Sequence, residues 1–138
     1  QGVLVAGLGT FAVVQERFRG KEVEYVIQRP VFQLDADVLR LLDLTVPQEN
    51  IPDSVEVEPL DYTWLSQATS FPPPVVESCV QETTFLYTLQ LWDGQHRAFA
   101  FRDIGVLSWR HGVLCMRFHG SCVAALESRD TPIALLRT

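Results

Sequence analysis

The stretch Gly7-Leu8-Gly9-Thr10-Phe11-Ala12-Val13 decides the fold, because it returns in altered form as Asp103-Ile104-Gly105-Val106-Leu107-Ser108-Trp109. Both stretches read as an apolar residue, a glycine, any residue, an apolar residue, any residue and an apolar residue. Gly9 and Gly105 are predicted to lie at equivalent turns between strands, since glycine adopts positive φ without a Cβ clash. A separation of roughly a hundred residues suits two copies of one small domain better than a solenoid repeat.

The composition predicts a folded protein that is poorly suited to nucleic acid. Of 138 residues, 47% are hydrophobic and 20% charged, which is enough for a core. No apolar stretch approaches the ~20 residues of a transmembrane helix, so no membrane partner is expected. The net charge is −6 and Lys21 is the single lysine. Because duplex binding draws most of its affinity from cations that neutralise phosphates, this balance argues against DNA as the partner.

Residues 1–46 predict three strands and a short helix. Two strands flank the turn at Gly9, the charged residues 16–22 predict a hairpin tip, and a third strand follows over 23–28. Pro30 is expected to end or bend that strand, because proline cannot donate to the ladder. Asp35 is the predicted N-cap of the helix that follows.

The rest of the chain divides into a linker and a second unit. Residues 47–59 contain three prolines and four acidic residues with little periodicity, and they predict an acidic, proline-containing linker. Residues 60–138 form the second unit, with a tail from 128 onward whose structure the sequence does not predict. Its predicted elements are a short helix near 60–68, a long helix over 75–91, strands over 97–101, 106–109 and 113–118, and a helix from 121 to 126.

The predicted fold class is therefore α+β, with two copies of one unit. The second copy has two helices, a three-stranded meander and a short final helix. The first copy shows only the meander and the final helix, so we expect it to lack its N-terminal helices. On this interpretation the chain is a fragment that begins inside the first domain.

No catalytic, cofactor-binding or metal-binding residue is predicted. The histidines have no Ser, Asp or Cys partner at a recognisable motif spacing. Cys115 and His119 fall on a strand and its exit, where two ligands would not converge on a metal. The turn at Gly7 lacks the Gly-Lys-Ser/Thr ending of a phosphate loop. The three cysteines are expected to be reduced, buried thiols.

Four basic residues flank the predicted hairpin tip and are the candidate nucleic-acid contacts. Glutamates are interleaved among them, which favours a solvated hairpin edge over a phosphate-binding patch. Phosphate binding remains the alternative interpretation. The four residues are Arg17, Arg19, Lys21 and Arg29.

The same stretches resemble a known superfamily. The run GVLVAGLGTFAVVQERF, followed by YVIQRPVFQLDADVLRLL, resembles the strand–turn–strand–hairpin–helix core of the HU/IHF histone-like superfamily. Nearly the whole chain is similar to the paired HU-like domains of the coiled-coil domain-containing protein 81 family. The residues that carry this likeness are Gly7–Phe11, Ile27–Phe32, Val76–Thr83 and Ile104–Leu107.

The resemblance implies a function as well as a fold. The family is eukaryotic and associated with the centrosome, so it implies a cytoplasmic, centrosomal location and a non-enzymatic interaction or scaffolding role with protein partners. HU-like domains dimerise, which implies an intrachain pseudo-dimer. Bacterial HU proteins bend DNA with long basic arms tipped by proline. Here the first hairpin, Glu16–Val23, is expected to be short, and the second is only Arg110–Gly112. Nucleic-acid binding through the HU-like fold is therefore the alternative.

Overall fold

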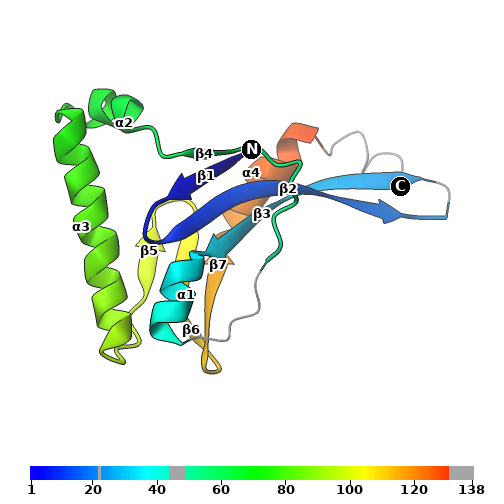
Figure 1. Ribbon diagram of the computed structural model, residues 1–138. Helices are drawn as coiled ribbons and strands as arrows, with labels where there is room; N and C mark the ends of the chain where they lie inside the picture. Colours follow the sequence, from blue (N-terminus) through cyan, green and yellow to red (C-terminus); the bar gives the residue numbers. More distant parts are fainter. Residues whose placement is uncertain (22, 44–48, 131–138) are drawn as a thin grey trace.

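The computed structural model describes residues 1–21, 23–43 and 49–130 (Figure 1). In these ranges the chain forms four helices and two sheets, which confirms the α+β class. The elements in chain order are β1 (Gly2–Val5), β2 (Gly9–Arg19), β3 (Glu24–Leu34), α1 (Ala36–Leu42), β4 (Val57–Pro59), α2 (Tyr62–Thr69), α3 (Pro73–Trp92), β5 (Phe99–Phe101), β6 (Gly105–Arg110), β7 (Val113–Phe118) and α4 (Gly120–Asp130).

The two sheets do not exchange strands. The first has the order β3-β2-β1-β4, and the second is the antiparallel meander β5-β6-β7. β4 lies within the stretch predicted as a linker, and it pairs in parallel with β1. The amide of Gly2 donates to the carbonyl of Glu56 at 2.7 Å, and the amide of Leu60 donates to that of Leu4 at 3.0 Å. The sequence analysis missed this strand because three residues are too few to show an alternating pattern.

The hairpin β2–β3 is much longer than expected. Its strands have 11 residues each and pair continuously from Gly9↔Leu34 to Arg19↔Glu24. Figure 1 shows its outer half extending well beyond the other helices and strands. We call this outer half, residues 15–28, the arm. The expectation of a short hairpin at Glu16–Val23 was wrong, because the outer residues of β2 are mostly exposed and so lack the apolar alternation by which strands are predicted.

Pro30 neither ends nor visibly interrupts β3. It pairs with Val13 in the middle of the ladder. The amide of Val13 points the other way, toward β1, where it donates to the carbonyl of Gln1 at 3.1 Å. Val13 and Pro30 therefore form a non-hydrogen-bonded pair, and the missing N–H of Pro30 falls on the open edge of the sheet.

The turns before Gly9 and Gly105 are closed in the same way. Leu8 donates its amide to the carbonyl of Val5, and Ile104 donates to Phe101, both at 3.0 Å. The carbonyls of Leu8 and Ile104 then accept amides from the residues just before α1 and α4, at 2.9 and 2.8 Å. The two meanders thus share the pattern of turn, strand pair and following helix.

The reason for glycine in these turns differs from the expected one. Positive φ occurs at Gly7 (80°) and Asp103 (62°). Gly9 and Gly105 instead begin β2 and β6, where a neighbouring strand comes very close. A Cβ on Gly9 would lie 2.3 Å from the carbonyl oxygen of Gln33, and one on Gly105 would lie 2.5 Å from that of Arg117.

One hydrophobic core joins both halves of the chain. The rings of Phe11 in β2 and Phe101 in β5 lie 5.0 Å apart, edge to face, so the two sheets are in contact. The buried members come about equally from residues before and after the segment 49–61. They are Leu8, Phe32, Leu34, Val38, Tyr87, Leu91, Leu107 and Leu114.

The long helix α3 confirms the predicted helix over 75–91. It begins with two prolines, which are tolerated in a first turn because the first amides have no partner within the helix. It ends at Trp92 with Asp93 as its C-cap, and Gly94 then adopts φ 77°. Its buried residues are Val76, Thr84, Tyr87 and Leu91, which face the core and leave the opposite side outward.

Candidate interaction surfaces

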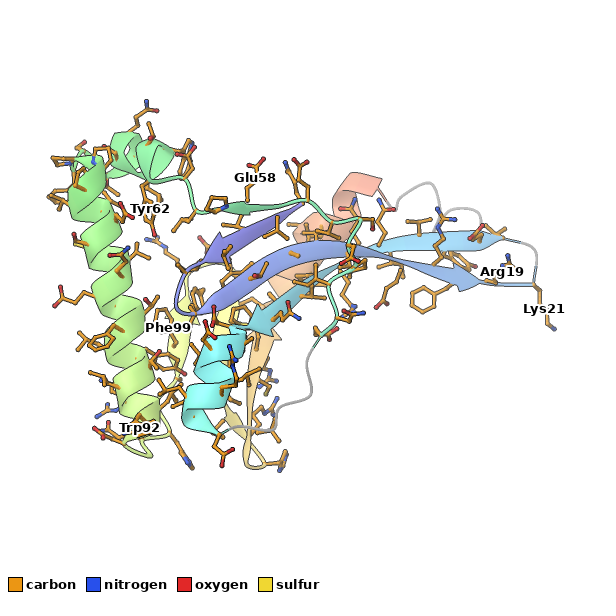
Figure 2. All side chains as sticks on the ribbon, in the orientation of Figure 1. Arg19, Lys21, Glu58, Tyr62, Trp92 and Phe99 are labelled. Atoms are coloured by element: carbon orange, nitrogen blue, oxygen red, sulfur yellow. The ribbon has the colours of Figure 1, made fainter. Side chains whose placement is uncertain are left out.

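Four exposed apolar side chains lie together where α1 meets α3. Phe85 is 61% exposed and Trp92 is 59% exposed, and Leu41 of α1 and Leu89 of α3 lie in the same groove. We call these four residues the α1–α3 face. Among the described residues that line the groove, none is charged. Figure 2 shows Trp92 near the lower end of α3.

Helical geometry explains why α3 has two apolar sides. Phe85, Leu89 and Trp92 are spaced by four and three residues, which puts them on one stripe of the helix. The buried residues Tyr87 and Leu91 lie on another stripe, which packs on the core. The sequence analysis used the apolar residues of this helix only to predict the helix, and it assigned none of them to a surface. Their number over 20 residues, more than one core-facing stripe needs, was the signal that it missed.

The arm carries its basic residues in different environments. Arg19 and Lys21 lie at its far end (Figure 2), where both are exposed. In the described ranges neither forms an ion pair. Arg17 lies 3.7 Å from Glu24, and both side chains are largely exposed, so this pair is weak.

Arg29 lies at the base of the arm and is held on two sides. Its Nε donates to Glu16 at 2.6 Å, and its two terminal nitrogens donate to the carboxylate of Glu49 at 3.0 and 3.2 Å. Hydrogen bonding to Glu49 raises the pKa of Arg29 above its ordinary value, and partial burial opposes that effect. Of the four candidate phosphate contacts, only Arg19 and Lys21 therefore combine an outward position with no carboxylate partner in the described ranges.

Each of the three histidines lies in a turn, a ring stack or a helix start. His96 stacks on Trp109 with ring centroids 4.8 Å apart. His111 and Gly112 both have positive φ and form the tight turn between β6 and β7, as expected for a two-residue hairpin loop. The amide of His119 donates to Ile104 at the start of α4.

The cysteines show a different burial from the one expected. Cys79 is exposed, whereas Cys115 and Cys122 are half-buried, and all three are free thiols. Cys79 of α3 lines a cavity together with Val80 and Phe99. Within the described part of the chain, no group of three His, Cys, Asp or Glu residues could hold a metal ion. No described helix is both long and apolar enough to cross a membrane.

The helix pair α2–α3, the meander β5–β7 and the helix α4 together define an HU-like domain, a class not known as an enzyme family. Residues 56–130 match the family of the CCDC81 eukaryotic HU domain 2. The chain belongs to this family, as the resemblance indicated. The match begins at residue 56, so β4 is part of the matched region although it pairs with the sheet of residues 1–34.

Proposed function

We propose that this chain is a protein-interaction or scaffolding module, without enzymatic activity, of a centrosome-associated protein. In this proposal residues 1–46 are the C-terminal part of a first HU-like unit, and residues 60–138 are the second unit. The equivalent turns at Gly9 and Gly105 and the shared core support an intrachain pseudo-dimer. Membership of the CCDC81 family supports the centrosomal assignment.

The α1–α3 face is the observation that carries this proposal. Large apolar side chains that lie together on a surface mark interaction sites more often than isolated ones do. Tryptophan and other aromatic residues supply much of the binding energy at protein interfaces. The groove is uncharged and the chain as a whole is acidic, so we expect partner binding through apolar contact with little dependence on salt.

Substitution on this face tests the proposal. The double variant Phe85→Ser/Trp92→Ser is compared with the parent in eukaryotic cells, with centrosomal enrichment of the tagged chain as the readout. Phe18→Ser, at an exposed phenylalanine of the arm, is the matched control. We expect the double variant to lose enrichment while the control keeps it. Unchanged enrichment of a folded double variant would contradict the proposal.

Nucleic-acid binding through the HU-like fold is the second candidate, and the arm favours it. The arm is a projecting two-stranded hairpin with Arg19 and Lys21 at its end, a shape that could lie along a nucleic-acid duplex. The arm carries no proline between Gly20 and Val23, and glutamates alternate with its cations. We therefore expect contacts with few phosphates and no wedge between base pairs.

A duplex titration at low salt separates the two candidates. The parent is run beside the variant Arg17→Glu/Arg19→Glu/Lys21→Glu. We expect no binding by the parent at micromolar protein, because the chain carries six excess negative charges. Micromolar binding that the variant loses would promote the nucleic-acid candidate.

A further inference from the structure

The two sheets differ at one edge. In the first sheet β1 is covered by β4, whereas in the second sheet β5 is the end strand of the described residues. The pairing of β1 with β2 has the same register as the pairing of β5 with β6, so β1 and β5 occupy equivalent positions in the two sheets. Val5 pairs with Gly9, as Phe101 pairs with Gly105.

The hydrogen bonds of β1 show which groups of β5 face outward. Gly2 and Leu4 point their backbone groups at β4, and the residues between and beside them point at β2. By the shared register, Ala100 of β5 takes the place of Leu4, and Ala98, just before β5, corresponds in sequence to Gly2. The amide and carbonyl of Ala100 therefore lie on the outer side of β5.

This edge is accessible and has little to block it. Ala98 and Ala100 are both exposed, and their side chains are single methyl groups. Natural edge strands are often protected by lysine, proline or a bulge, and neither alanine provides such protection. Residues 95–102 contain Arg97 and Arg102 and no carboxylate, in a chain whose net charge is −6.

We infer that the β5 edge binds an extended acidic segment of a protein partner as an added parallel strand. The precedent is β4, which joins β1 in parallel and carries Glu58, with Glu56 just before it. In the same register on β5, a carboxylate at the position of Glu56 lies level with Arg97. Backbone hydrogen bonds give such strand addition its affinity, and the flanking charges select the segment. The inference rests on the proposed function, whose partner it describes by its chemistry.

A synthetic peptide with the sequence of Asp53–Leu60 is the probe. It is titrated into the isotope-labelled chain, and amide shifts are followed by NMR. We expect the shifts to centre on Ala98 and Ala100. Shifts confined to Gly2 and Leu4 would mean exchange with β4 and would overturn the inference. Absence of binding up to about 1 mM peptide would also overturn it.

Two variants of the chain test the mechanism. Ala100→Pro removes an outward amide and leaves the bonds from β5 to β6 in place, so we expect affinity to fall about tenfold or more. If this variant does not fold, Arg97→Glu/Arg102→Glu serves instead. It should lose affinity for the probe and regain it with the peptide that carries Glu56→Lys and Glu58→Lys. Equal affinity of the parent for both peptides would contradict the charge selection.

Failure of this inference can be distinguished from failure of the proposed function. The Phe85→Ser/Trp92→Ser variant keeps the β5 edge and should bind the peptide as the parent does. If that variant also keeps its centrosomal enrichment, the proposed function fails while strand addition stands. If the peptide does not bind and enrichment still depends on Phe85 and Trp92, only the strand addition fails.

Discussion

The phenolic hydroxyl of Tyr87 donates a hydrogen bond to the backbone carbonyl of Arg97, with 3.0 Å between the two oxygens. The ring of Tyr87 also packs edge to face on Phe99, with centroids 5.0 Å apart. One residue of α3 therefore holds both the chain that enters β5 and the first ring of that strand. This contact fixes the second sheet against the helix whose other side carries the α1–α3 face.

Removing this hydroxyl tests how much the contact contributes. Tyr87→Phe should lower the free energy of unfolding by about 1 kcal/mol, because the carbonyl of Arg97 loses its partner. Urea unfolding followed by circular dichroism measures the change. Tyr25→Phe on the arm is the control and should change stability by less than about 0.5 kcal/mol. Equal effects of the two substitutions would contradict this role of Tyr87.

Because of Tyr87, the free energy of unfolding is expected to fall at high pH. Burial raises the pKa of Tyr87 from 10.0 to about 12. The folded state therefore holds this proton more tightly than the unfolded state does. The resulting stability is fully present below pH 10.0 and is lost as the pH rises through about 12. Urea midpoints between roughly pH 8 and 11 should fall less steeply for Tyr87→Phe than for the parent. Parallel curves would show that Tyr87 does not titrate differently in the two states.

The glycines that begin β2 and β6 should not tolerate a side chain. Gly9→Ala and Gly105→Ala would each press a methyl group against a backbone carbonyl of the neighbouring strand. We expect each to cost more than about 1 kcal/mol in thermal or urea unfolding. Gly120→Ala, where no atom lies within 4 Å of the added methyl, should be neutral or stabilising. If all three variants unfold alike, the close approach of the strands is not what requires glycine.

Much of the fold could be predicted because its elements carry strong local signals. The repeated turn, the N-cap at Asp35 and the apolar spacing of α3 each depend on a few neighbouring residues. The length of the arm could not be predicted, because its charged outer residues look like a loop in the sequence. They are held in strands by backbone pairing between β2 and β3. β4 was missed for a related reason, because only the nearby edge of β1 makes Val57–Pro59 a strand.

The candidate surfaces were harder to predict than the fold. The sequence analysis assigned no role to Trp92, because the exposure of this residue depends on which elements cover α3. Arg29 reads like the other basic residues of the hairpin, but the chain after α1 brings Glu49 to it. Both outcomes depend on contacts between segments far apart in the chain, which periodicity does not encode.

The ion pair between Arg29 and Glu49 provides the last prediction. The two side chains meet through two hydrogen bonds, but both are well exposed, at 38% and 47%, so solvent screens their attraction. A double-mutant cycle with Arg29→Met and Glu49→Gln should give a coupling energy of roughly 0.2–1 kcal/mol. The coupling should weaken between about 0.01 M and 1 M salt, because the Debye length falls from roughly 30 Å to 3 Å. Arg17→Met with Glu24→Gln is the matched control, and its longer contact should give a smaller coupling. A coupling for Arg29 and Glu49 that is absent, or that does not change with salt, would show that this pair does not hold the segment after α1 against the base of the arm.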